Sequence, residues 1–273
     1  VEAAYFLHVA GDDVRASTFF RQAAAGQPPA VRAAIAQMAI DLGRPEIGIR
    51  IGKDAAADGI IIADQYYPLH AVAKRDWHVP TEYAMAIARQ ESELNARAAS
   101  GAGARGLMQL MPATARGMAD AVGIEFRSDR LTEPLYNARL GTEYLARMLD
   151  RYDGAYVLAT AAYNAGPGRV DQWLEAIGDP RDGSVDPVVW VESIPFTETR
   201  NYVMRVLESL HVYRARLLGR PEALRLVADL GGAGAEVHVS TRNLEGAAAE
   251  AAGVEPAALS PESAVSSPAA PPG

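Results

Sequence analysis

The chain has no cysteine and no long apolar run. The absence of Cys from all 273 residues excludes disulfides, thiolate metal ligands and cysteine nucleophiles, but it leaves the compartment open because many periplasmic proteins also lack Cys. No stretch of about 18 consecutive apolar residues is present, so the sequence predicts no transmembrane segment. The chain opens on Val1-Glu2-Ala3, with neither a starting Met nor a basic segment ahead of an apolar one. We therefore interpret it as a processed or truncated product.

Basic charge and histidine are also scarce. Lys and Arg total 26 against 34 Asp and Glu, which gives a formal net charge of −8. Phosphate contacts need a basic surface, so this balance argues against a nucleic-acid partner. The five His residues lie far apart in the sequence, without the spacing of a metal site. We expect neither a metal nor an organic cofactor.

Helical periodicity dominates what is present. In the first sixty residues, Ala16, Phe19, Phe20 and Ala23 recur at i, i+3, i+4 and i+7, which is typical of an amphipathic helix. A second such set follows, and it consists of Val31, Ile35, Met38, Ala39 and Leu42. Gly and Pro clusters at 26–29 and 43–45 separate the helices, so we expect α-hairpins like those of helical repeat arrays.

Three segments are predicted: hairpins over 1–68, a mainly helical domain over 69–220, and a C-terminal extension over 221–273. Within the domain, the pattern predicts one helix over about 134–152, stopping at Gly154. It predicts a last long helix with Thr197 as its N-cap. Five of the 17 prolines fall in the last eighteen residues, among Ala and Ser, and such a composition predicts a disordered tail.

A carboxylate lies on the apolar stripe of the helix predicted over 81–95. That stripe consists of Ala84, Ile87, Ala88, Glu91 and Leu94. Burial disfavours the ionised form of a carboxyl group and raises its pKa, which suits a general acid near neutral pH. Glu93 falls on another face and is expected to be solvated. The alternative for Glu91 is a structural Glu satisfied by hydrogen bonds or an arginine.

Three further segments carry residues that could approach a ligand or face a cleft. A Gly-rich loop at 100–106 allows the backbone to approach a ligand closely, and residues 107–112 follow it. One helix must end at Gly166 and another begin at Pro167, which leaves Tyr163 and Asn164 in a final turn with polar tips free to face a cleft. Residues 190–202 combine acids with aromatics, which suits sugar binding and ordinary helix capping equally. A core Tyr is the alternative for Tyr163.

Four of these motifs, in this order, resemble those of the soluble lytic transglycosylases with a lysozyme-like catalytic domain. They are Ala-Arg-Gln-Glu-Ser at 88–92, Gly-Leu-Met-Gln at 106–109, Ala-Tyr-Asn-Ala-Gly-Pro-Gly at 162–168 and Ile-Pro-Phe-Thr-Glu-Thr-Arg at 194–200. The opening hairpins are similar to the end of the superhelical domain that precedes the catalytic domain in larger members. The resemblance therefore implies a mainly α fold, with a lysozyme-like domain after hairpins of a helical superhelix.

The resemblance also implies an activity and a set of site residues. Glu91 is the implied single acid/base, which cleaves the β-1,4 bond between N-acetylmuramic acid and N-acetylglucosamine without water and leaves a 1,6-anhydro ring. Tyr163 is expected to hydrogen-bond close to the catalytic carboxyl, and Glu198 to be a second cleft carboxylate, with Glu192 a weaker candidate. The substrate-binding set expected from the motifs is Ser92, Gln109, Met111, Tyr163, Asn164, Glu192, Glu198 and Tyr202.

The implied partners are peptidoglycan glycan strands, with cell-wall or envelope-assembly proteins as further candidates, and the substrate implies a periplasmic location. Two alternatives remain open. A hydrolytic muramidase on the same fold would activate water with a second carboxylate, for which Glu198 and Glu192 are the motif acids available. A non-catalytic wall-binding module would keep only the fold.

Overall fold

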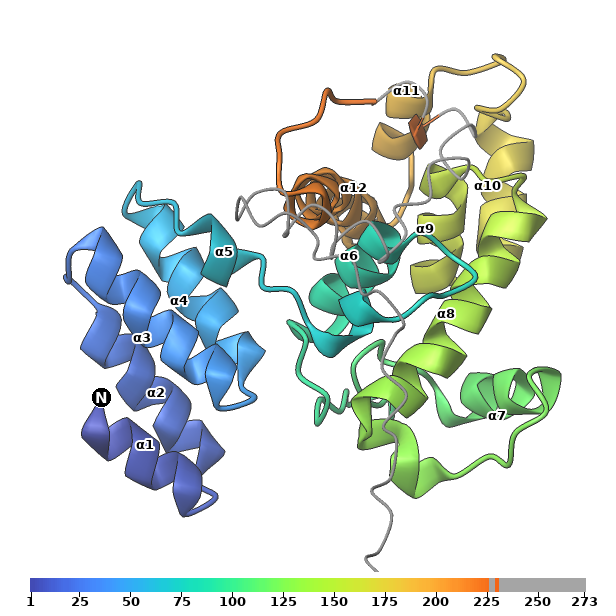
Figure 1. Cartoon of the computed structure of the whole chain (residues 1–273). Helices are drawn as coiled ribbons and strands as arrows, with labels where there is room; N and C mark the ends of the chain where they lie inside the picture. The colour runs from blue at the N-terminus through green and yellow to red at the C-terminus, as the bar shows by residue number, and fades with distance from the viewer. Residues whose placement is uncertain (226–228, 231–273) are drawn as a thin grey trace, which may run out of the picture.

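The computed structural model describes residues 1–225, 229 and 230, and this part of the chain is almost entirely helical (Figure 1). Within it, the extended pairing consists of isolated antiparallel bridges that join Arg105 to Ala99 and to Leu110. The expected mainly α fold is confirmed. The expected disordered tail lies, from residue 231 onward, outside the described residues. No helix in the described part combines the length and apolar character needed to cross a bilayer.

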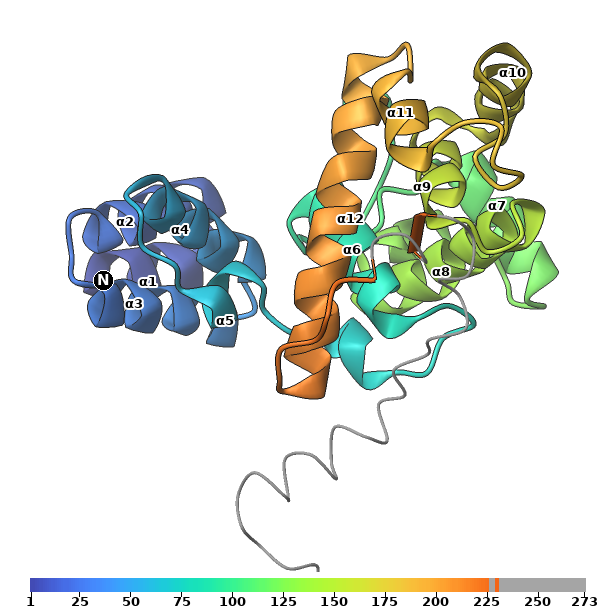
Figure 2. The same cartoon turned by 90° about the horizontal axis from the view of Figure 1, so that it is seen from above.

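The N-terminal hairpins form a helical unit beside the main body in both views (Figures 1 and 2). Their helices are α1 (Glu2–Val9), α2 (Asp13–Ala24), α3 (Pro29–Asp41), α4 (Pro45–Ala57) and the short α5 (Ala63–Tyr66). Phe20, Ile35 and Ile47 are buried in a core of their own. The predicted stripes are narrower than expected, because Phe19 is 48% exposed and Met38 41% exposed.

The main body is built around α6, with the long α12 packed along it (Figure 2). Its elements are η1 (Ala71–Lys74), α6 (Thr81–Ser92), α7 (Pro112–Ala121), η2 (Ser128–Thr132), α8 (Pro134–Arg151), α9 (Tyr156–Ala165), α10 (Pro167–Ile177), α11 (Pro187–Glu192) and α12 (Thr197–Leu218). Every side chain of α6 from Thr81 to Arg89 is buried. Because α6 is packed tightly on all sides, the side chains of its last turn are held at a fixed position in the domain.

The helix predicted over 134–152 is α8, and it ends one residue earlier than expected. The predicted N-cap of the last helix is wrong by one residue: Thr197 is its first helical residue and Phe196, with an extended backbone, is the cap. No side chain caps this end, so the hydroxyl signal that favours Thr at an N-cap does not decide the boundary here.

The helix predicted over 81–95 ends earlier, at Ser92, because Glu93 and Leu94 adopt left-handed backbone conformations with φ of 55° and 64°. Glu93 was expected to be solvated, and that prediction is wrong. Its carboxylate is partly buried and accepts hydrogen bonds from Arg50, at 2.7 Å, and from Lys53, both on α4. Burial alone would raise the pKa of Glu93, but these two cations outweigh it and lower the pKa. The hairpins and the end of α6 are thereby joined.

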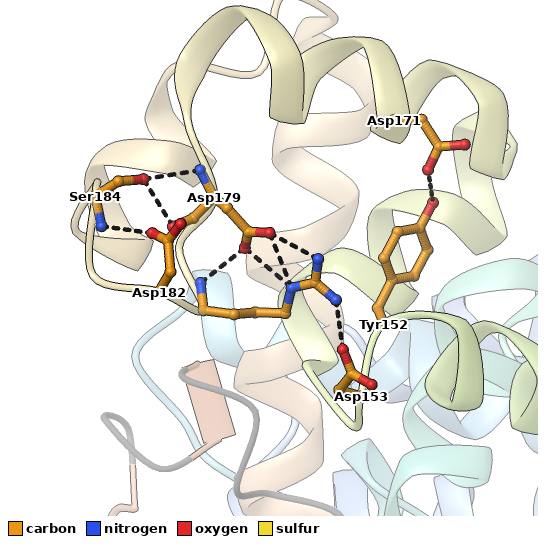
Figure 3. A network of polar contacts seen from close by, with 7 residues as sticks. Tyr152, Asp153, Asp171, Asp179, Asp182 and Ser184 are labelled. Carbon is orange, nitrogen blue, oxygen red and sulfur yellow. Dashed lines mark hydrogen bonds and ion pairs between the residues drawn. The ribbon is translucent and has the colours of Figure 1, made fainter.

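A second polar network fixes the loop between α10 and α11 (Figure 3). The Arg181 guanidinium donates to Asp179, at 2.7 Å from Nη2, and to Asp153 in the α8–α9 turn, at 2.8 Å from Nη1. Nearby, the Tyr152 hydroxyl donates to Asp171 of α10 at 3.0 Å. These contacts tie the start of α9, which carries Tyr163 at its other end, to the elements that follow it. The boundaries at 68 and 220 remain predictions.

Candidate active site

A cleft of about 830 Å³ opens where α6, the loop before α7, α8, α9 and α12 meet. Its volume is in the usual range for ligand sites. Most of the predicted site residues line it, namely Glu91, Gln109, Met111, Tyr163, Asn164, Glu198 and Tyr202. Residues as distant in the sequence as Glu91 and Tyr202, which are 111 positions apart, therefore contribute side chains to one cavity.

Glu91 lies in the last turn of α6, and its side chain is half-buried. Burial raises its pKa, the hydrogen bond from Tyr202 lowers it, and the charge of Glu198 raises it, with a net value of about 7. A carboxyl group with such a pKa is protonated in about half of the molecules at neutral pH, so it can serve as a proton donor and then as a base.

Tyr202, on α12, holds the Glu91 carboxylate. Its hydroxyl donates a hydrogen bond of 2.6 Å to Glu91 Oε1. Burial and the negative charge of Glu91 raise the pKa of Tyr202 well above its usual value, so the phenol keeps its proton. It fixes one carboxylate oxygen and leaves Oε2 for a substrate.

Tyr163 was expected to hydrogen-bond close to the Glu91 carboxyl, and its hydrogen bond goes to the protein backbone. Its hydroxyl donates to the backbone oxygen of Met108 at 2.9 Å, and its ring packs against that of Tyr144, with centroids 5.2 Å apart. The hydroxyl that bonds directly to the Glu91 carboxyl is that of Tyr202, because α12 packs directly along α6. Beside Tyr163, Asn164 accepts a hydrogen bond of 2.7 Å from the Thr199 hydroxyl, which joins the end of α9 to α12.

Gln109 and Asn137 hold the loop between α6 and α7 in shape. Gln109 has a left-handed backbone, with φ of 46°, and its side-chain nitrogen donates to the carbonyl oxygens of Ala98 and Gly106. Asn137, fully buried on α8, accepts from the Met108 N–H at 2.8 Å and donates to the Arg105 carbonyl at 2.9 Å. The loop is therefore preorganised before any ligand binds.

Two of the predicted site residues, Ser92 and Glu192, are not among the residues that line the cleft. Ser92 is buried, and its hydroxyl bonds to the backbone oxygens of Ala88 and Leu107. Glu192 ends α11, with an exposed side chain, and its backbone oxygen accepts a hydrogen bond from Arg200. Both were placed by motif, and position next to a motif residue in sequence did not bring either side chain into the cleft.

Sequence reasoning missed several lining residues. They are Gln90, Thr114, Tyr144, Asn201 and Arg205, among others. A usable signal existed on α12, where Glu198, Asn201, Tyr202 and Arg205 stand at i, i+3, i+4 and i+7 and so share one face. Asn137 was missed as well. Its signal is an amide next to the apolar stripe predicted for 134–152.

The sequence of the main body is similar to that of known proteins. Residues 68–182 match the family model described as the Transglycosylase SLT domain. A soluble lytic murein transglycosylase of Salmonella typhimurium is 44% identical over 161 residues, which cover 58% of this chain and 24% of the relative. Membrane-bound lytic murein transglycosylase C of Actinobacillus pleuropneumoniae is 32% identical over 169 residues, covering 55% of this chain and 46% of the relative.

Two solved structures extend the likeness to the fold. The 70 kDa soluble lytic transglycosylase of Escherichia coli matches with a TM-score of 0.71 and 31% identity, over 84% of this chain and 37% of the other. An inactive Glu-to-Gln mutant of the lytic transglycosylase Slt from Pseudomonas aeruginosa matches with a TM-score of 0.67 and 34% identity, over 80% of this chain and 35% of the other. The chain thus spans about a quarter of the length of the first curated relative.

Proposed function

We propose that this chain, whose residues 68–182 match the transglycosylase SLT domain, cleaves the β-1,4 bond between N-acetylmuramic acid and N-acetylglucosamine in peptidoglycan and leaves a 1,6-anhydromuramic acid end. The observation that carries the proposal is Glu91, a carboxyl group with a pKa of about 7 that lines the cleft and is held by Tyr202. The activity belongs to the periplasm, where the substrate lies, and peptidoglycan strands are the partner.

In the first step, the protonated Glu91 gives its proton to the glycosidic oxygen as the bond to C1 of the muramyl residue breaks. In the second step, the Glu91 carboxylate takes the proton from the C6 hydroxyl of the same sugar while that oxygen bonds to C1. The nucleophile belongs to the reacting sugar, so its effective concentration is high and no water is consumed. The carboxyl group returns to its protonated form.

The remaining lining residues bind and orient the sugar in this proposal. Gln109, Met111, Asn164 and Glu198 contact the glycan, and Tyr163 shapes the wall beside them. Tyr202 acts on Glu91 and is a positioning residue. Because they lie outside the cleft lining, Ser92 and Glu192 are assigned no contact with substrate.

One observation favours a second candidate, a hydrolytic muramidase. Glu198 lines the same cleft as Glu91, and a second carboxylate could activate water. Mass spectrometry of the muropeptides released from purified peptidoglycan separates the two: anhydro products are lighter by one water than hydrolytic ones. Free reducing ends would replace the proposal with the muramidase, and no release at all would leave a wall-binding module.

The first prediction concerns the pH dependence of turnover. Glu91 must start each cycle protonated, and its pKa is about 7. We expect the rate constant kcat/KM for peptidoglycan to fall as pH rises above about 7, with a slope of about one decade per pH unit. A profile that stayed flat between pH 6 and 9 would contradict Glu91 as the acid.

The second prediction uses two variants with opposite effects on that profile. The Tyr202 hydroxyl lowers the pKa of Glu91 and the Glu198 charge raises it. Tyr202→Phe should therefore move the alkaline limb to higher pH, and Glu198→Gln should move it to lower pH. Shifts in the same direction, measured under one buffer series, would contradict the role assigned to one of the two side chains, and no shift in either variant would contradict both.

A further inference from the structure

A trough of about 890 Å³ lies between the segment 70–77 and the start of α8, and it shares no lining residue with the cleft. A smaller cavity of about 570 Å³ continues it toward the end of α7. Trp77 and Arg139 line both. Along α8 the wall passes through Leu135, Arg139 and Glu143, at intervals of four residues.

The trough is preformed by internal contacts. The Trp77 indole nitrogen donates to the Val72 carbonyl at 2.9 Å, which fixes the ring. Across from it, the Tyr136 hydroxyl donates to the Glu125 backbone oxygen at 3.2 Å. Aromatic rings that are held in place by hydrogen bonds from their polar atoms suit the binding of a ligand with both polar and apolar parts.

Four arginines line this trough, and two of them form ion pairs with described residues. Arg127 pairs with Asp129 and Arg130 with Glu133. The side chains of Arg75 and Arg139 are exposed and, among the described residues, take part in no ion pair or hydrogen bond. Two such guanidinium groups, one directly after η1 and one on α8, are well suited to carboxylates, which accept charge-assisted hydrogen bonds from arginine.

The two arginines lie on a chain that is acidic as a whole. The chain carries a formal net charge of −8, so its overall field disfavours an acidic polymer, and attraction has to come from local basic sites. Peptidoglycan is such a polymer, because the peptide stems on its glycan strands end in carboxylates. It also repeats these stems, so a second site can bind the same strand or a neighbouring one while the cleft is occupied.

We propose that the trough is a second peptidoglycan-binding site, which takes the carboxylates of peptide stems through Arg75 and Arg139. This inference rests on the proposed function only for the identity of the polymer. It assigns the trough to retention of the enzyme on the insoluble wall and gives it no part in bond cleavage.

The test is pelleting of the full chain with purified sacculi, in a Glu91→Gln background that leaves the wall uncut. We expect Arg75→Ala/Arg139→Ala to weaken binding to intact sacculi roughly tenfold. Arg15→Ala/Arg220→Ala removes the same charge from exposed positions elsewhere and should stay within about twofold of the parent. With Glu91 restored, the trough variant should cleave short soluble glycans at the parental rate.

Sacculi stripped of their peptides by an amidase distinguish the ligands. The proposal expects the trough variant and its parent to bind stripped glycan equally. Equal binding to intact sacculi, or an equal loss in the control variant, would overturn the site. A loss that persisted on stripped glycan would overturn the peptide assignment, and a parent that failed to pellet would overturn a second site altogether. The proposed function is judged separately, by the anhydro products of the wild-type chain.

Discussion

Replacing Glu91 by Gln is expected to lower the turnover of peptidoglycan by about 10³-fold or more, because a positioned acid/base contributes roughly 10²–10⁴ and here one group performs both proton transfers. Gln can accept the hydrogen bond from Tyr202 through its amide oxygen, so the 2.6 Å contact need not be lost. It can neither donate a proton to the glycosidic oxygen nor take one from the C6 hydroxyl. The measurement is the initial rate of anhydro-muropeptide release.

The matched control is Glu93→Gln, the same change two residues away. Glu93 is tied to Arg50 and Lys53 and is not among the residues lining the cleft, so this variant should keep its rate within a few-fold while losing some stability. Both variants should keep the wild-type circular dichroism spectrum. If both variants lost activity, the cause would be a disturbance of the end of α6 and not the loss of the Glu91 carboxyl group. If Glu91→Gln kept near-normal activity, the proposed mechanism would be wrong.

Stability gives a second check on Glu91. Its pKa is about 4.5 in an unfolded chain and about 7 in the folded one, so the folded state binds more protons between these values. Stability is therefore lost as pH rises from 4.5 to 7, and the burial of the charged group is fully unfavourable above that range. Glu91→Gln removes this penalty, and at pH 8 its Tm should be no lower than that of the wild type.

The local sequence pattern was enough to predict those features of the helices that depend on residues close together in the sequence. The stripe through Ala84, Ile87 and Ala88 placed Glu91 on a buried face, and Gly166-Pro167 fixed the junction of α9 and α10. These features follow from helical periodicity and from the conformations that Gly and Pro allow. The resemblance of four short motifs led to the proposed reaction class.

Long-range contacts were beyond such reasoning. Nothing near Glu93 in the sequence indicates that α4 supplies Arg50 and Lys53 as its ion-pair partners. Likewise the Tyr202 hydroxyl meets Glu91 only because α12 packs along α6. The residues placed outside the lining, Ser92 and Glu192, show the same limit, since a motif position does not specify where a side chain points.

Replacing Gly106 by Ala, in the loop before α7, is expected to lower both the stability of the protein and its turnover of peptidoglycan. Gly106 is buried with φ of 79°, and a Cβ there would lie 2.0 Å from the Leu131 carbonyl oxygen and 2.4 Å from Asn137 Nδ2. The left-handed backbone and the overlap together should lower the free energy of unfolding by roughly 2–5 kcal/mol. Either the backbone or Asn137 must move, and Asn137 holds the Met108 N–H. Gln109 then shifts, so peptidoglycan turnover should fall as well.

Gly103→Ala is the control that isolates the overlap. Gly103 lies in the same loop with φ of 94°, but no atom lies within 4 Å of the Cβ it would gain. It should lose only the backbone contribution, roughly 1–2 kcal/mol, and keep its rate. Urea unfolding of the two variants measures the difference directly. Equal losses of stability and activity would mean that the loop relaxes around a side chain at 106, and the preorganisation of Gln109 by Asn137 would then have no energetic support.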